Sequence, residues 1–190
     1  MVDVVERKRA SALPAEERRS AIIEATLPLL LEHAEMVTTR QIAEAAGIAE
    51  GTIFRVFEDK DAAIAAVVDA ACDSALIEDA LRALDADQPL EGLLTGAIEL
   101  LQRRTIEIWR LLSSVGPRFH DHARRPMDSP ALTALFEAHR DEITVAPAEA
   151  ARQLRAVTLA ATHPMLSDAP MPAHRVAQLF LHGVSAGRPC

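Results

Sequence analysis

A short stretch, GTIFRVF, carries side chains that could contact a nucleic acid. In a helix, Gly51, Thr52 and Arg55 share one face, while the apolar Ile53 and Phe57 lie on the opposite face. A threonine hydroxyl can bond a phosphate or touch a thymine methyl, and a guanidinium can reach guanine or a phosphate. The pattern therefore predicts a short helix that buries its apolar face and presents the Thr–Arg face to the major groove of DNA.

Two histidines that flank an aspartate form a second chemical candidate. His120, Asp121 and His122 could bind a divalent metal, as in an all-α metal-dependent hydrolase. That chemistry needs a further histidine upstream, and the sequence holds none between His33 and His120. No Ser/His/Asp set, cysteine nucleophile or phosphate-binding glycine loop stands out either. We keep the hydrolase as the alternative, and we expect a protein that is no enzyme and has no metal and no cofactor.

A glycine turn precedes the Thr–Arg segment. Thr38 and Gln41 have the spacing of a capping box, which predicts a helix over 39–46. Gly47 follows at the point where helices commonly end in the left-handed conformation. A second short helix is then expected over 50–57. Two short helices around a tight turn form a helix-turn-helix unit, whose second helix reads the groove.

The remaining chain is also predicted to be helical. A first helix is expected from Pro14 to Ala34, and Asp59 offers an N-cap for one long helix over about 60–84. Further apolar-periodic segments follow, separated by Pro-rich stretches. They cover residues 90–114, 131–143, 148–163 and 173–186, with an irregular stretch over 114–130. The pattern predicts an all-α fold.

The composition favours packed helices and limits the partners. The 190 residues include no Tyr and 3% aromatic residues, whereas strands prefer aromatic and β-branched side chains. The N-terminus lacks the apolar core of a secretory signal, and no stretch approaches the roughly 18 apolar residues of a membrane span. We expect a cytoplasmic protein with no membrane partner and two reduced cysteines. The net charge is −8, so any DNA contact must come from a local cationic face.

The stretch TTRQIAEAAGIAEGTIFRVFEDKDAAI resembles the N-terminal signature of the TetR/AcrR family of bacterial transcriptional regulators. The matching residues are Thr39, Ile42, Ala43, Ala46, Gly47, Gly51, Thr52, Phe57 and Lys60, with Ile48, Ile53 and Ile64 as conservative equivalents. Where the family usually has Ser, Lys and Tyr, this chain has Ala49, Glu50 and Phe54, and Val56 replaces a frequent His. These departures predict fewer contacts with the DNA backbone, and hence weaker affinity or a shallower dependence on salt.

The resemblance implies a fold, a domain organisation and a function. It implies about nine helices: a helix-turn-helix DNA-binding domain at 14–59, after a basic arm at 1–13, and an effector-binding and dimerisation domain at 60–190. It further implies a homodimeric regulator, in most relatives a repressor, that binds a palindromic operator in double-stranded DNA and is released by a small-molecule effector. The arm, with Arg7, Lys8 and Arg9, could enter a minor groove or remain a solvated terminus.

The resemblance also implies three sets of site residues. The residues assigned to DNA are Thr38, Thr39, Arg40, Gly51, Thr52, Phe54, Arg55 and Lys60. The effector pocket is expected at Leu101, Trp109, Leu112, Phe119 and Phe136. The dimer interface is expected at Leu154, Val157, Ala161, Val176, Leu179, Phe180 and Gly183, although the same apolar stripes could cover the chain's own core.

Overall fold

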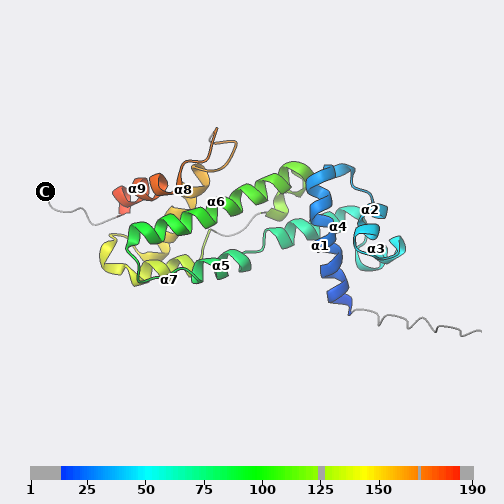
Figure 1. The fold of residues 1–190 in the computed structure, drawn as a ribbon, viewed down its shortest axis with the longest axis horizontal. Coiled ribbons are helices and arrows are strands. Elements are labelled where there is room, and N and C mark those ends of the chain that lie inside the picture. Colours follow the sequence, from blue (N-terminus) through cyan, green and yellow to red (C-terminus); the bar gives the residue numbers. More distant parts are fainter. Residues whose placement is uncertain (1–13, 124–126, 167, 185–190) are drawn as a thin grey trace, which may run out of the picture. The chain divides into compact units, whose positions relative to one another are not determined.

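The computed structural model describes residues 14–123, 127–166 and 168–184, and these residues form helices and turns without a strand (Figure 1). The all-α prediction with about nine helices is confirmed, since the described residues contain nine α-helices and three short 3₁₀ segments. No described helix is both long enough and apolar enough to cross a membrane. The basic arm with Arg7, Lys8 and Arg9 lies outside the described residues.

The chain divides into two compact units, an N-terminal unit that ends at Val67 and a C-terminal unit that begins at Val68. The α-helices are α1 (Ala15–His33), α2 (Thr39–Ala45), α3 (Glu50–Val56), α4 (Lys60–Ala71), α5 (Ala75–Arg82), α6 (Leu90–Val115), α7 (Pro130–Ala138), α8 (Pro147–Ala160) and α9 (Ala173–Val184). The boundary between the units falls within α4, whereas the sequence led us to begin the second domain at the first residue of that helix.

The predicted long helix over 60–84 is wrong, because the structure forms α4 and α5 with a break between Ala71 and Ala75. The Asp73 carboxylate accepts a hydrogen bond from the Ala75 amide at 3.0 Å, so its side chain replaces a backbone partner. Arg104 of α6 donates to the carbonyl oxygens of Ala71 and Asp73. Arg104 therefore supplies the hydrogen bonds that these two oxygens would otherwise receive within a continuous helix. The apolar pattern of the sequence could not predict this break in the helix.

The N-terminal unit is built on contacts that α1 makes with α2 and α3. Its apolar core includes Ile22 and Leu30 of α1, Ile42 of α2 and Ile53 of α3, all of which are buried. Thr26 is buried in the same helix and donates its hydroxyl to the Ile22 carbonyl oxygen at 2.6 Å. The core side chains of α2 and α3 come from one face of each short helix, which leaves the other face outward.

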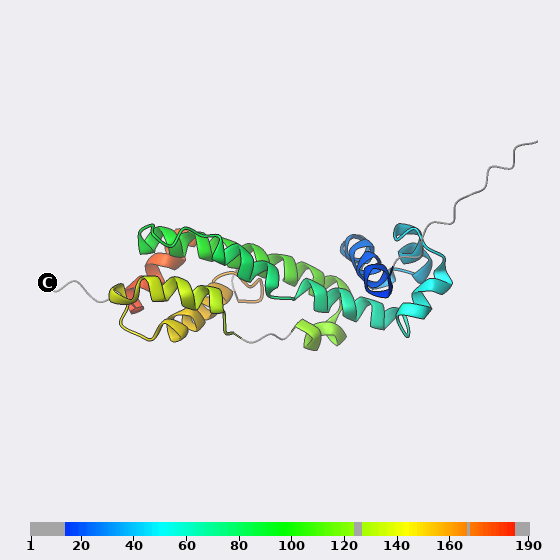
Figure 2. The same cartoon turned by 90° about the horizontal axis from the view of Figure 1, so that it is seen from below.

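The C-terminal unit packs around the 26-residue helix α6, which contacts α5, α8 and α9, while α7 packs against α5 and α8 (Figure 2). Its core combines side chains from all of these helices, among them Leu93, Leu132 and Leu154. One carboxylate lies inside this unit. Glu78 accepts hydrogen bonds from the Ser129 hydroxyl at 2.5 Å and the Ala131 amide at 2.8 Å, and therefore caps the start of α7.

Candidate nucleic-acid interface and ligand pocket

The turn between α2 and α3 has the geometry predicted for Gly47. Its φ is +65°, in the left-handed region, and a Cβ at this position would meet no atom within 4 Å. The Ile48 amide donates to the Ala43 carbonyl at 2.9 Å and the Gly47 amide donates to the Glu44 carbonyl at 3.2 Å. These two bonds form a Schellman motif. The requirement for glycine is therefore conformational rather than steric.

The start of α2 has the predicted capping box. The Thr38 hydroxyl accepts a hydrogen bond from the Gln41 amide at 3.2 Å, and the Gln41 side-chain oxygen accepts one from the Thr38 amide at 2.9 Å. The two bonds satisfy backbone donors that a helix start leaves without partners. Thr38 therefore sets where α2 begins and remains exposed.

The two faces of α3 lie as the sequence pattern predicted. Ile53 is fully buried, whereas Gly51, Phe54 and Arg55 are exposed and Thr52 is half-buried. The Phe54 side chain is 52% exposed, which is unusual for an aromatic ring. A Cβ at Gly51 would meet no atom within 4 Å, so nothing in the described chain requires glycine there. Glycine inside a helix costs about 1 kcal/mol relative to alanine, so close approach of an external partner would explain this residue.

Glu50 has a role that the sequence analysis missed. The Thr39 hydroxyl at the start of α2 donates a hydrogen bond of 2.5 Å to the Glu50 carboxylate at the start of α3. Ala49, the N-cap of α3, makes no side-chain cap, as its methyl group requires. Glu50 is thus the acidic group in the first turn of α3. Its carboxylate accepts the hydrogen of the Thr39 hydroxyl, which we had assigned to a phosphate. The sequence feature that could have indicated this role is Glu50 itself, at a position where the family signature usually has a lysine.

The cations predicted to contact DNA differ in their environments. Arg40 and Arg55 are exposed on α2 and α3. Lys60 is half-buried and donates from its ammonium nitrogen to the carbonyl oxygen of buried Val37 at 3.1 Å. That bond ties the start of α4 to the segment before α2. Asp59 caps α4 as predicted, since its carboxylate accepts the Ala62 amide at 2.7 Å.

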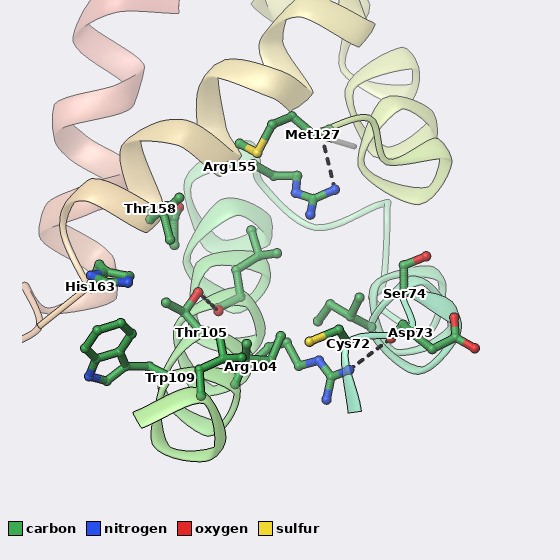
Figure 3. Close-up of a pocket in the computed structure, with 15 residues that line it drawn as sticks. Cys72, Asp73, Ser74, Arg104, Thr105, Trp109, Met127, Arg155, Thr158 and His163 are labelled. Carbon is green, nitrogen blue, oxygen red and sulfur yellow. Dashed lines mark hydrogen bonds between the residues drawn. The ribbon is translucent and has the colours of Figure 1, made fainter. Parts of the chain in front are cut away.

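A cavity of about 310 Å³ opens in the C-terminal unit (Figure 3). Its lining comes from α6, α8 and the segments around them. The lining residues are Cys72, Asp73, Ser74, Ile77, Leu101, Arg104, Thr105, Ile108, Trp109, Leu112, Met127, Arg155, Thr158, Leu159 and His163. This volume lies at the small end of the range for ligand pockets, about 300–1,000 Å³.

Three of the five predicted pocket residues, Leu101, Trp109 and Leu112, line this cavity, and the other two do not. Phe136 packs in the core against Phe180, with 5.9 Å between ring centroids. Phe119 is buried elsewhere, beneath a neighbouring guanidinium in the 3₁₀ segment Pro117–Ala123. The structure therefore corrects the prediction that Phe119 and Phe136 line the pocket. An apolar residue type does not distinguish a side chain that fills a core from one that lines a cavity.

The polar part of the pocket lining was missed altogether. Arg104 and Thr105 of α6 interrupt an apolar stripe, and Arg155 and Thr158 of α8 do the same. Polar residues at helical spacing within such stripes were the available signal. His163 completes the set and stacks edge-on against Trp109, with 4.3 Å between ring centroids.

The predicted dimer residues separate into two groups. Leu154, Val176 and Phe180 are buried in the core of their own chain, so they have no surface to give to a partner. They correct the prediction, because α6, α7 and α9 already cover the apolar stripe of α8, and α6 and α8 cover that of α9. Leu179 is 56% exposed, and Val157 and Ala161 are half-buried. Gly183 lies near the end of α9.

The His–Asp–His triplet of the alternative hydrolase lies in the 3₁₀ segment Pro117–Ala123. His120 and Asp121 are exposed, and the His122 ring nitrogen Nδ1 lies 3.3 Å from the Asp69 carboxylate. Across the described ranges, no three or more His, Cys, Asp or Glu side chains come together in a way that could hold a metal ion. The residues needed to complete a metal centre do not converge there.

Comparison with known proteins agrees with this architecture. The family model for bacterial regulatory proteins of the tetR family matches residues 22–67, which run from α1 into α4. No curated protein matches the sequence. Solved structures of similar fold share low sequence identity with this chain, and three of them are described next.

A Mesorhizobium loti MAFF303099 protein described as a TetR-family transcriptional regulator is 17% identical, with a TM-score of 0.69, over 92% of this chain and 100% of its own. A tetR-family transcriptional regulator from Streptomyces coelicolor is 19% identical, with a TM-score of 0.58, over 90% and 80%. NalD, the secondary repressor of the MexAB-OprM multidrug efflux pump in Pseudomonas aeruginosa, is 21% identical, with a TM-score of 0.55, over 90% and 98%. The fold of this chain is that of TetR-family transcriptional regulators.

Proposed function

We propose that this chain, which has the TetR-family fold, is a DNA-binding regulator that represses transcription from a palindromic operator as a homodimer. A small molecule bound in the C-terminal unit releases it from DNA. The match of residues 22–67 to the tetR family supports the DNA-binding role. Chromosomal DNA as the partner places such a regulator in the cytoplasm, and the role requires no catalysis.

The observation that carries the proposal is the outward face of α3. Gly51, Phe54 and Arg55 are exposed there, while Ile53 anchors the helix from behind. Arg55 and Thr52 are assigned to base edges, and the exposed Phe54 ring is assigned to an apolar contact such as a thymine methyl. The missing side chain at Gly51 allows the DNA to approach the helix backbone.

The contacts to phosphates are assigned to the helix starts around this face. Thr38 and Thr39 lie at the start of α2, and Lys60 lies at the start of α4. Amide groups at a helix N-terminus favour anions, and Arg40 adds an exposed positive charge. With two cations per protomer assigned to phosphates, Arg40 and Lys60, we expect roughly four phosphate contacts per dimer and a log–log salt slope of about −4.

The homodimer is assigned to the outward faces of α8 and α9. Leu179 of α9 is 56% exposed, although large apolar side chains are usually buried. Val157 and the C-cap residue Ala161, at the end of α8, are half-buried and supply small side chains for close approach. A two-fold symmetric pair of such faces would match a palindromic operator.

Release by a ligand is assigned to the contact between α6 and the end of α4. Arg104 lines the pocket and at the same time holds the carbonyl oxygens of Ala71 and Asp73, where α4 ends. The same helix α4 begins in the N-terminal unit at Lys60. A ligand that binds better to one position of Arg104 would shift the equilibrium between two positions of α4.

The test is selection of bound sequences from random duplex DNA with the purified protein. Enrichment of a palindrome with two half-sites about one helical turn apart is the expected outcome. A pool that remains random at low salt would refute the DNA-binding role. Enrichment of a single half-site without symmetry would refute the homodimer while preserving DNA binding.

A further inference from the structure

In the described part of the chain, two guanidinium groups of the pocket donate to backbone carbonyl oxygens rather than to carboxylates. Arg104 donates from Nη2 to the carbonyl oxygens of Ala71 and Asp73, and Arg155 donates from Nη1 to those of Met127 and Asp128, at 3.2 and 2.9 Å. Within the described residues neither group forms an ion pair. A guanidinium has five N–H donors, so each side chain retains donors from the remaining nitrogens.

Burial makes this arrangement costly for the charged form of Arg155. Burial lowers the pKa of the Arg155 guanidinium from its usual value, while the charges of Glu78 and Asp128 oppose that shift. Glu78 is engaged by Ser129 and Ala131, and Asp128 by Arg152. Neither carboxylate therefore serves Arg155 as a direct partner. An anion brought into the pocket would compensate for lost hydration of this charge.

A buried hydroxyl points to a ligand independently of these charges. Thr158 lines the pocket and is 1% exposed, and its Oγ1 has no hydrogen-bond partner in the described part of the chain. The next threonine along α8, Thr162, shows the usual alternative, because its hydroxyl donates to the Thr158 carbonyl at 2.6 Å. A buried unsatisfied hydroxyl costs free energy, which closure of the pocket around a polar ligand atom would recover.

The other side of the pocket is apolar and aromatic. Figure 3 places the guanidinium groups of Arg104 and Arg155 away from Trp109 and His163, which lie together on the opposite side of the cavity. Side chains such as Ile108 and Leu112 add aliphatic surface to the lining. A molecule that fits both sides has a charged head and a compact apolar body.

We infer that the pocket binds a small organic carboxylate, with its anionic group on the side of the cavity that carries Arg104 and Arg155 and its apolar body against Trp109. This inference rests on the proposed function in that it names the chemical class of the effector. It also connects ligand binding with α4, because Arg104 would hold the carboxylate with its remaining donors while Nη2 holds the carbonyl oxygens of Ala71, at the end of that helix, and of Asp73.

The test uses pairs of probes that differ only in charge. Trp109 is the only tryptophan, so its fluorescence reports binding to the full-length protein without DNA. We would titrate 3-phenylpropanoate and octanoate against their neutral amides, and 3-phenylpropylamine as the cationic counterpart. The expected result is saturable binding of at least one carboxylate, about tenfold or more tighter than its amide, with no binding of the amine. Equal affinity for acid and amide, or no saturable response to either acid, overturns the inference.

Variants identify the groups responsible. Arg104→Gln and Arg155→Gln should each reduce the ratio of carboxylate to amide affinity, whereas Arg103→Gln, an exposed neighbour on α6, should not. This ratio is measured only on variants whose helical circular dichroism matches that of the parent. An unchanged ratio in both pocket variants refutes the assigned anion site.

Thr158→Val separates a ligand contact from a structural role. Removing an unsatisfied hydroxyl should raise the melting temperature of the free protein. The same change should weaken carboxylate binding, so stability and ligand affinity change in opposite directions. The control Thr162→Val removes a satisfied hydroxyl and should lower the melting temperature without changing the affinity ratio. Unchanged carboxylate binding in Thr158→Val would contradict the assigned contact. Carboxylate selectivity in a protein that enriches no DNA sequence would refute the proposed function and support this ligand class.

Discussion

The Thr39 hydroxyl and the Glu50 carboxylate join the starts of α2 and α3 through a hydrogen bond of 2.5 Å between Oγ1 and Oε1. Both residues are placed on the surface that we assign to DNA. The bond satisfies a carboxylate that would repel phosphate, and it holds a hydroxyl that could otherwise bind phosphate. We therefore expect this hydrogen bond to stabilise the helix pair at the expense of DNA affinity.

Replacing this carboxylate should strengthen DNA binding. Glu50→Gln removes one negative charge per protomer near the phosphates and weakens the hold on Thr39. We expect operator affinity to rise about tenfold at moderate salt, with the largest gain at low ionic strength. Fluorescence anisotropy across a salt series is the measurement. Glu32→Gln makes the same charge change on exposed α1 and serves as the control; an equal gain in both variants would show a bulk-charge effect only.

Arg55 should be essential for operator binding and dispensable for folding. Its side chain is exposed on α3, so Arg55→Ala removes no core contact. We expect a loss of roughly 30-fold or more in operator affinity if two base contacts are removed from the dimer, at about 1–3 kcal/mol each. Gel shift and sedimentation check binding and dimerisation together. Arg103→Ala is the matched control, and retention of operator binding by Arg55→Ala would refute the assigned interface.

The turn glycine Gly47 and the helical glycine Gly51 should respond oppositely to replacement by alanine. Gly47→Ala forces a Cβ into the left-handed region and should destabilise the N-terminal unit by about 1–2 kcal/mol. In Gly51→Ala the new methyl group meets no other atom, so the substitution should stabilise α3 by up to about 1 kcal/mol. Thermal unfolding measures both changes. Gly51→Ala should nevertheless weaken operator binding, because the added methyl lies on the proposed contact face; full affinity there would mean that the DNA does not approach Gly51.

The buried carboxylate of Glu78 should be essential to the C-terminal unit. Glu78→Ala leaves the Ser129 hydroxyl and the Ala131 amide without their acceptor, at a cost of about 2–4 kcal/mol. The free energy of unfolding from a denaturant titration is the measurement. Asp79→Ala removes an exposed carboxylate from the same helix and should change stability by less than about 1 kcal/mol. Similar effects in both variants would contradict a specific role for the buried cap.

Local features of the fold could be predicted because they depend on residues close in sequence. The capping box at Thr38, the left-handed Gly47 and the apolar face of α3 each involve fewer than ten consecutive residues. Helical periodicity and the conformational freedom of glycine act over that range, so the helix-turn-helix geometry follows from its own segment. The break between α4 and α5 could not be predicted this way, because it is satisfied in part by Arg104, 31 and 33 residues further along the chain.

The sequence by itself determined that the chain is helical, that a turn forms at Gly47, and that Arg55 and Ile53 lie on opposite faces of the helix after it. Only the tertiary structure decided that Leu154, Val176 and Phe180 are core residues, and that Arg104, Arg155 and Thr158 line one cavity with Trp109. An apolar stripe specifies that a helix face must be covered, but not what covers it. The covering partner is set by contacts between segments distant in sequence, and the same contacts determine where a cavity and its unpaired polar groups remain.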